Sequence, residues 1–270
     1  MNLEAAETYA RRHTLEALVV ERAGKVVLER YAGGFDRDKP HALYSGTKSF
    51  WGAVAVLARD EGVLELDEPV AKTLVEWNDP VRRRVTVRQL LDLTSGIGFG
   101  GLGNAVPTVE RAIATQLKDE PGKTFTYGGI PLQVFGAVLA RKLGRSPQAY
   151  LTENVFEPIG LRVASWRTLK DGTQPLPTGA YLGAGEWLKY GRYVLENAER
   201  FAPCFAGSKP NPRYGLTFWL SPIAAHPALV YASGARGQAL YVDPPSETIV
   251  VKFGDSASYN HETFLTRLSL

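Results

Sequence analysis

Residues 43–63 read LYSGTKSFWGAVAVLARDEGV. Ser45 and Lys48 lie three positions apart in this stretch, a spacing at which two side chains of a helix share one face. An apolar pattern with helical spacing follows directly, at Phe50, Trp51, Val54 and Leu57. The stretch therefore predicts an apolar helix that carries a hydroxyl and an amine side by side at its amino end.

The pairing of serine with lysine suits nucleophilic catalysis. A serine hydroxyl becomes a good nucleophile only when a neighbouring base removes its proton, and a lysine with a depressed pKa can do so. At a helix amino end, unpaired backbone N–H groups can also stabilise an oxyanion. Serine-and-lysine hydrolases use this S-x-x-K arrangement. The simpler interpretation is that Ser45 caps the helix and Lys48 points into solvent.

Composition excludes several classes of function. With 270 residues and 44% hydrophobic content, the chain can bury a core as one domain, residues 1–270, or as two packed lobes. The net charge of +3 is too small to indicate a nucleic-acid partner. Cys204 is the only cysteine, which excludes an intrachain disulfide and a thiolate metal cluster.

The chain also lacks membrane and export signals. No stretch reaches the roughly 18 apolar residues of a membrane span, so no membrane partner is expected. The first 13 residues lack the apolar segment of a signal peptide and carry acidic residues. We therefore expect a cytoplasmic protein, although a chain trimmed of its leader would look the same.

Strand patterns lie at both ends of the chain, and helical patterns lie between them. We expect strands at 15–21, 25–31, 229–232, 238–242 and 248–253, and helices at 3–13, 129–143, 185–198 and 258–268. Ala23-Gly24 marks a tight hairpin between the first two strands. Thr86 to Gln89 has capping-box spacing, and Ser146-Pro147 starts a further helix.

This order predicts an α+β fold. The strands of residues 1–44 and 212–270 would join in one antiparallel sheet flanked by helices. Residues 45–211 would form a mainly helical lobe inserted between them. The catalytic candidates fall where the sheet and this lobe would meet, which is a favoured place for a pocket.

Five segments together resemble a known family. They are LYSGTKSFWGAVAVLARDEGVLELDEPVAKTLVEW (43–77), VTVRQLLDLTSGIGF (85–99), PGKTFTYGGIPLQVFGAVLARKLGRSPQAYLTENVFEPIGL (121–161), YGLTFW (214–219) and SGARGQALYVDP (233–244). In this order and at these separations, they resemble the serine β-lactamase-like family of class C β-lactamases, D-alanyl-D-alanine carboxypeptidases and family VIII-type esterases. The resemblance implies a β-lactamase/transpeptidase-like fold and a serine hydrolase that forms an acyl-enzyme and uses neither a metal nor a cofactor.

The resemblance also implies a catalytic set. Ser45 matches the nucleophile, Lys48 its lysine partner, and Tyr127 the tyrosine of the family's Tyr-x-Asn motif. A phenol and an amine both have pKa values near 10 in water, so neither is a good base alone at neutral pH. Placed together, the ammonium would favour the phenolate, and burial would disfavour the lysine charge. One proton can then be shared among the three groups.

Residues 232–234, Ala-Ser-Gly, occupy the place of the family's third motif, Lys-Thr-Gly or His-x-Gly. They would lie on the strand that lines the pocket, with Ser233 and Gly234 beside the substrate. The Ala235 N–H would then join that of Ser45 in holding the oxyanion. A shifted register instead places residues 235–237 on the motif and moves this donor to Gln238. Ser-Gly is also a common turn pair.

Two departures from the family pattern bear on the substrate. The asparagine of Tyr-x-Asn is Gly129 here, which removes an amide that would bind a substrate amide carbonyl. The cation that opens the third motif is Ala232, or Ala235 in the shifted register. Simple esters need neither contact, so both departures favour an esterase. Arg236 would either restore a cation nearby or lie solvated at the surface, and Trp219 would lie in the core or at the pocket edge.

Other motifs are weaker. The glycine-rich stretch 96–103 satisfies G-x-G-x-x-G, but it follows a helical pattern rather than a strand. We interpret it as a flexible loop over the site instead of a dinucleotide site. The four histidines show no metal spacing, because Leu265 stands where the second histidine of H-E-x-x-H would be. Among the histidines, His226 is the least disfavoured candidate for a Ser-His catalytic pair.

The sequence thus favours a metal-free serine hydrolase whose partner is a small-molecule ester or amide. Small carboxylic esters are the expected substrates. The alternative within enzymes is a β-lactamase or a D-amino-acid-directed amidase or peptidase. The alternative from another class is a ligand-binding descendant without turnover. The sequence leaves the oligomeric state open.

Overall fold

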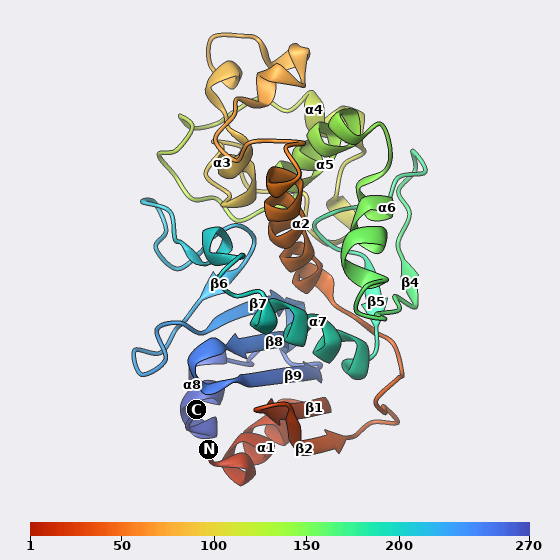
Figure 1. Ribbon diagram of the computed structural model, residues 1–270, viewed down its shortest axis with the longest axis vertical. Coiled ribbons are helices and arrows are strands. Elements are labelled where there is room, and N and C mark those ends of the chain that lie inside the picture. The colour runs from red at the N-terminus through yellow and green to blue at the C-terminus, as the bar shows by residue number, and fades with distance from the viewer.

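A six-stranded antiparallel sheet forms the lower part of the computed structural model, which describes residues 1–270 (Figure 1). Its strand order is β2-β1-β9-β8-β7-β6. The strands are β1 (Leu15–Arg22), β2 (Lys25–Tyr31), β6 (Trp219–Leu220), β7 (Val230–Gly234), β8 (Gln238–Asp243) and β9 (Thr248–Gly254). The pairing of β1 with β9 joins the two ends of the chain in one sheet, which confirms the predicted fold class.

Local sequence explains the two hairpins that bracket this sheet. Ala23 and Gly24 both adopt positive φ, 47° and 74°, as a two-residue turn between β1 and β2 requires. At the other end of the chain, Pro244 opens the turn between β8 and β9, and Glu247 closes it in the left-handed region. The predicted turns are therefore present where the sequence placed them.

Helices cover both faces of the sheet. Side chains alternate along each strand, so Leu18 and Val250 pack against α1 (Leu3–Arg12) and α8 (His261–Leu268). The intervening positions, such as Val19 and Val251, join the larger core on the opposite face. There α7 (Ala184–Glu196) lies across β8 and β9 (Figure 1). This helix falls within residues 45–211, yet it packs against the sheet.

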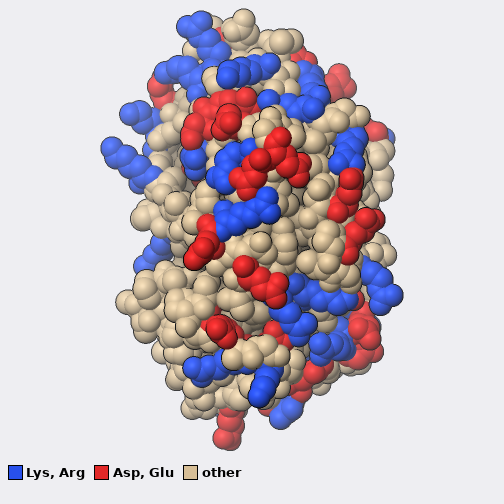
Figure 2. Space-filling model, in the orientation of Figure 1, with Lys and Arg blue, Asp and Glu red and all other residues tan.

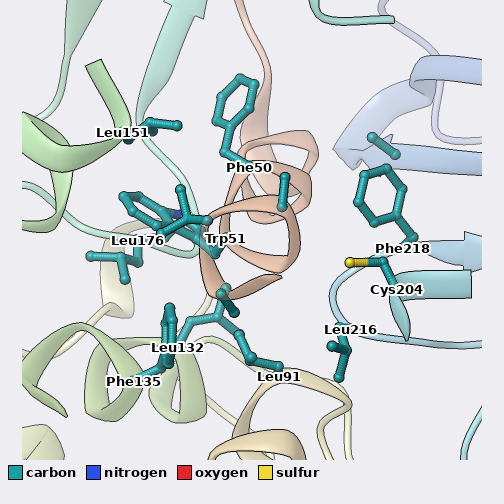
Figure 3. Packing of buried hydrophobic residues seen from close by; sticks show 14 of the residues in the cluster. Phe50, Trp51, Leu91, Leu132, Phe135, Leu151, Leu176, Cys204, Leu216 and Phe218 are labelled. Atoms are coloured by element: carbon teal, nitrogen blue, oxygen red, sulfur yellow. The ribbon is translucent and has the colours of Figure 1, made fainter. Parts of the chain in front are cut away.

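The remaining helices form the upper part of the molecule around α2. They are α2 (Ser49–Asp60), α3 (Val87–Leu91), α4 (Val109–Ile113), α5 (Ile130–Leu143) and α6 (Pro147–Leu151). Every residue of α2 from Ser49 to Ala58 is buried, as expected for a helix with apolar residues all round. Side chains from several other segments surround it in Figure 3, among them Leu91, Leu132, Leu176 and Leu216.

Close backbone approach fixes α2 in place. The Gly52 N–H donates to Thr217 Oγ1 at 3.0 Å, and a Cβ atom at Gly52 would lie 2.1 Å from the Leu216 carbonyl oxygen. Only glycine permits this contact. The helix that follows the candidate nucleophile is therefore held rigidly against the segment that leads into β6.

A second, three-stranded sheet was not predicted. It has the order β3-β5-β4 and consists of β3 (His41–Ala42), β4 (Ser165–Trp166) and β5 (Ala180–Leu182). Strands of two or three residues are too short to show the alternation from which a strand is recognised. This sheet matters because β3 leads directly into the turn that carries Ser45.

The surface carries no dominant charge on the face shown in Figure 2, where basic and acidic side chains are interspersed. This distribution agrees with the small net charge of +3. None of the helices combines the length and the apolar character needed to cross a bilayer.

Candidate active site

Ser45 lies in a tight 3₁₀ turn, Tyr44–Lys48, that continues into α2. Tyr44 adopts φ of 47°, a left-handed conformation that is uncommon for a bulky residue and that marks stored backbone strain. The Ser45 hydroxyl caps no helix, because its hydrogen-bond partner is the Lys48 amine. The capping interpretation is therefore wrong, and the strained turn presents the hydroxyl to a pocket.

The Lys48 amine is buried beside this hydroxyl. Its Nζ atom lies 2.9 Å from Ser45 Oγ and donates to the Pro177 carbonyl at 3.2 Å, and the side chain is 1% exposed. No carboxylate pairs with it. Burial lowers the pKa of Lys48 from 10.5 to about 7. A large fraction of the amine is therefore neutral at neutral pH, with its lone pair available for the Ser45 proton.

Tyr127 approaches from the segment that precedes α5. Its ring stacks on Trp219 with centroids 5.6 Å apart, and Lys48 Nζ lies 4.9 Å from the Tyr127 ring centroid. Burial raises the pKa of Tyr127, and interactions with Ser45 and Trp219 oppose this only in part. The expected phenolate is therefore disfavoured. Lys48 is therefore the candidate base, and Tyr127 is a candidate phenol donor.

The end of β7 closes the other side of the site. A Cβ atom at Gly234 would lie 2.2 Å from the Leu43 carbonyl oxygen, so glycine is needed for β7 to lie against the Ser45 turn. The backbone N–H groups of Ser45 and Ala235 have no carbonyl acceptor among the backbone hydrogen bonds of the turns, loops and helix caps. Both belong to residues that line the pocket, so both are candidate oxyanion donors.

These elements enclose a pocket of about 340 Å³. Its lining residues are Tyr44, Ser45, Leu102, Gly103, Tyr127, Thr178, Trp219, Ser233, Gly234 and Ala235. None of them carries a charged side chain. Tyr44, Gly103 and Thr178 also line an adjoining pocket of about 300 Å³, where Arg167 is the one charged residue.

Six of the nine predicted site residues line this pocket. Lys48 lies buried behind Ser45, and the other two, Arg236 and Gly129, lie away from the pocket. Arg236 turns away with φ of 64° and pairs with Asp255. Gly129 is absent from the lining, and its N–H donates to the Gly100 carbonyl at 2.9 Å. A Cβ atom at Gly129 would lie 1.9 Å from the Gly101 carbonyl oxygen. The glycine-rich loop therefore occupies the space that an asparagine at 129 would need.

The structure favours the first of the two registers for the third motif. Ser233 and Gly234 belong to β7 and face the pocket, whereas Gln238 is buried and holds the Gly254 backbone. Ala232 is a buried core residue. Ala235 is therefore the candidate oxyanion donor on this side, because it lines the pocket.

Sequence reasoning missed His261, whose Nε2 atom lies 2.9 Å from Ser233 Oγ. It reaches the site from α8, 28 residues along the chain, and no local motif signals this contact. His226, the histidine considered for a Ser-His pair, lies elsewhere, with its Nδ1 2.8 Å from Asp243 and its Nε2 beside the Leu270 carbonyl.

Comparisons with known proteins bear on the family and the fold. A model of the Beta-lactamase family matches residues 7–263. Protein flp of Staphylococcus aureus (strain MW2) is 25% identical over 171 residues, which cover 56% of this chain and 34% of that protein. The matched part thus spans about a third of the length of this curated relative.

Two solved structures share the fold. A putative beta-lactamase from Bacteroides dorei DSM 17855 has a TM-score of 0.83 at 17% identity, covering 98% of this chain and 96% of that chain. EstCE1, described as a hydrolase with promiscuous acyltransferase activity, has a TM-score of 0.78 at 18% identity. The match covers 98% of this chain and 97% of that chain. At these identities the likeness shows the fold alone.

The pKa of Lys48 predicts the pH dependence of the site. Because the base must be neutral to accept the Ser45 proton, kcat/KM for an ester should fall as pH drops below about 7. A pH–rate profile with p-nitrophenyl butyrate should show a single ascending limb between about pH 6 and 8. A flat profile over this range would rule out Lys48 as the base.

Burial of Lys48 also predicts a stability effect. Its folded pKa lies below the unfolded value, so the unfolded chain binds more protons between about pH 7 and 10.5, and the free energy of unfolding rises with pH in this window. Lys48→Met should therefore raise the free energy of unfolding at pH 7 by about 1–3 kcal/mol, net of lost hydrogen bonds. This gain should shrink towards pH 10.

Denaturant titrations at several pH values measure this effect. Lys72→Met is the matched control, because it removes the same charge from an exposed site. Equal behaviour of the two variants would contradict a destabilising buried amine at position 48.

Proposed function

Because the chain belongs to the beta-lactamase family, we propose that it is a serine hydrolase that acts through an acyl-enzyme on small carboxylic esters. The observation that carries the proposal is the 2.9 Å contact between Ser45 Oγ and a buried amine whose pKa is about 7. A serine beside a base that is substantially neutral at neutral pH is an activated nucleophile. The family fold supports the hydrolase, and the uncharged pocket supports the ester.

Acylation begins at Ser45. As its Oγ bonds to the ester carbonyl carbon, Lys48 Nζ takes the hydroxyl proton. Negative charge develops on the carbonyl oxygen, where the N–H groups of Ser45 and Ala235 can stabilise it. The carbon–oxygen bond to the alcohol then breaks, and the Tyr127 phenol gives its proton to the departing oxygen. Lys48 returns the proton to Tyr127.

Deacylation uses the same groups with water in place of the alcohol. Lys48, now neutral, accepts a proton from water as the water oxygen bonds to the acyl carbon. The N–H pair stabilises the second tetrahedral intermediate, and its collapse breaks the bond to Ser45 Oγ. Ser45 recovers its proton and the carboxylic acid leaves. The protein groups named here, together with water, carry out every step.

Lack of charge in the pocket favours esters over β-lactams and D-alanyl peptides. Those substrates bring a carboxylate into the site, and an unpaired carboxylate loses its hydration without compensation. Here Arg236 is paired with Asp255 outside the pocket, and Ala232 carries no charge. Gly129 likewise offers no amide. Arg167 in the adjoining pocket is the cation on which a β-lactamase or peptidase reading would depend.

Covalent labelling tests the nucleophile. A fluorophosphonate probe should label the wild-type protein at Ser45, and Ser45→Ala should abolish both labelling and ester turnover while the fold is retained. Ser49→Ala is the matched control, because it removes a buried hydroxyl one turn away that bonds to the Gly46 carbonyl. Labelling that persists in Ser45→Ala, or no labelling of the wild type, would refute the proposal.

A substrate panel tests the ester assignment. We expect kcat/KM for p-nitrophenyl butyrate to exceed that for a chromogenic cephalosporin by about 10–150-fold, the value of a missing hydrogen bond to a charged group. Comparable turnover of both would instead indicate a β-lactamase. In that case Arg167→Ala should selectively weaken cephalosporin turnover.

A further inference from the structure

Four side chains form a hydrogen-bonded series that ends at the catalytic pocket. Ser233 Oγ lies 2.9 Å from His261 Nε2, and His261 Nδ1 lies 2.7 Å from the Tyr241 hydroxyl. The Tyr241 hydroxyl in turn lies 3.0 Å from that of Tyr259. Ser233 lines the pocket, whereas the other three lie behind it, on α8, on β8 and before α8. The mechanism above uses none of them.

The imidazole in this series is neutral. Burial, with a further contribution from the positive charge of Lys252, lowers the pKa of His261 to about 4. A neutral imidazole carries one N–H, so one ring nitrogen donates and the other accepts. The protons of the series can therefore point either towards the pocket or away from it.

The partners of Tyr259 decide between these directions. Its hydroxyl has one hydrogen-bond partner in the structure, the Tyr241 hydroxyl. If the protons pointed away from the pocket, Tyr241 would donate to Tyr259, and the Tyr259 proton would have no acceptor. If they point towards the pocket, Tyr259 donates to Tyr241 and Tyr241 donates to His261 Nδ1. The three groups behind the pocket then each donate to a protein acceptor. Burial raises the pKa of the Tyr259 hydroxyl, so a proton left there without an acceptor would be more costly than a Ser233 proton that faces the pocket.

Lys252 favours the same direction. Its ammonium lies 4.1 Å from the centroid of the Tyr259 ring, and its pKa of about 8 keeps it mostly charged at neutral pH. Hydroxyl dipoles next to a cation are stabilised when their hydrogen ends point away from it. The protons of the series therefore point from Lys252 towards Ser233.

This direction determines what Ser233 can do. His261 Nε2–H donates to Ser233 Oγ, so the serine proton is not used within the series and is free to point into the pocket. We propose that His261 is a positioning residue that holds the Ser233 hydroxyl as a hydrogen-bond donor to the substrate. The enzyme would then select esters that carry a second oxygen acceptor, such as an ether oxygen, near the scissile bond. This proposal rests on the proposed esterase function.

Matched substrates that differ by one oxygen test this selectivity. The acyl-side pair is p-nitrophenyl methoxyacetate against p-nitrophenyl butyrate, and the alcohol-side pair is 2-methoxyethyl acetate against n-butyl acetate. Each kcat/KM is divided by the rate constant for hydroxide hydrolysis of the same ester, which removes intrinsic reactivity. In the wild type, we expect one of the pairs to favour the ether by about 2–12-fold, the value of one neutral hydrogen bond.

Variants then assign the preference. Ser233→Ala should abolish it, and so should His261→Leu. Tyr241→Phe should reduce it, because the imidazole is then free to accept the Ser233 proton. His261→Gln should retain it, since its amide can accept from Tyr241 and donate to Ser233. Tyr231→Phe, whose ring lies 4.9 Å from that of His261 without a hydrogen bond to it, is the matched control.

The preference is a ratio of two substrates on one enzyme, so it does not depend on the fraction of protein that is folded. A purely structural role of His261 would lower turnover of both members of a pair equally and leave the ratio unchanged. The proposal is overturned if neither pair shows a preference in the wild type. It is also overturned if His261→Leu and Tyr241→Phe keep a preference that Ser233→Ala removes. Fluorophosphonate labelling separates the two kinds of failure. If the probe labels Ser45, only the selectivity proposal has failed. If it does not, the esterase proposal itself has failed.

Discussion

Removal of the Lys48 amine from water is the constraint on which the rest of the structure depends. Lowering the pKa of an amine from 10.5 to about 7 corresponds to a free-energy cost on the order of 4–5 kcal/mol for the charged form. The packing of the surrounding core must offset this cost, and α2, which follows Lys48 directly, is buried from Ser49 to Ala58. The Pro177 carbonyl satisfies the amine without neutralising it, as a carboxylate would. The same burial lowers both the stability of the fold and the pKa of the amine.

Close backbone contacts position the groups around this amine. Gly234 lets β7 approach the turn that carries Ser45, and Gly52 lets α2 approach the segment before β6. The strained φ of Tyr44 turns the Ser45 hydroxyl into the pocket between them. Sheet and helices thus meet at the candidate catalytic residues, so small displacements of either would move Ser45 away from the end of β7.

The sequence predicted much of this arrangement, because the main signals are local. Hydrophobic alternation located β1, β2, β8 and β9, and the capping residues Thr86 and Ser146 are observed to cap their helices. Ser45, Lys48 and Tyr127 meet as the motifs implied. The position of Arg236 and the environment of Gly129 could not be predicted, because each depends on contacts between distant segments. The contact between Ser233 and His261 could not be predicted either, because it also joins segments distant in the sequence.

The pairing of β1 with β9 has a consequence for how the chain folds during synthesis. Val19 lies opposite Val251, so this strand pair closes a loop of more than two hundred residues. Contacts this distant in sequence form late, because the chain loses the entropy of loop closure before these contacts can stabilise it. The β1–β2 hairpin therefore leaves the ribosome long before its partner strand exists, with one edge unpaired. The turn that carries Ser45 and Lys48 packs against β7 and β8, so a nascent or truncated chain without these strands lacks part of the shell around the Lys48 amine.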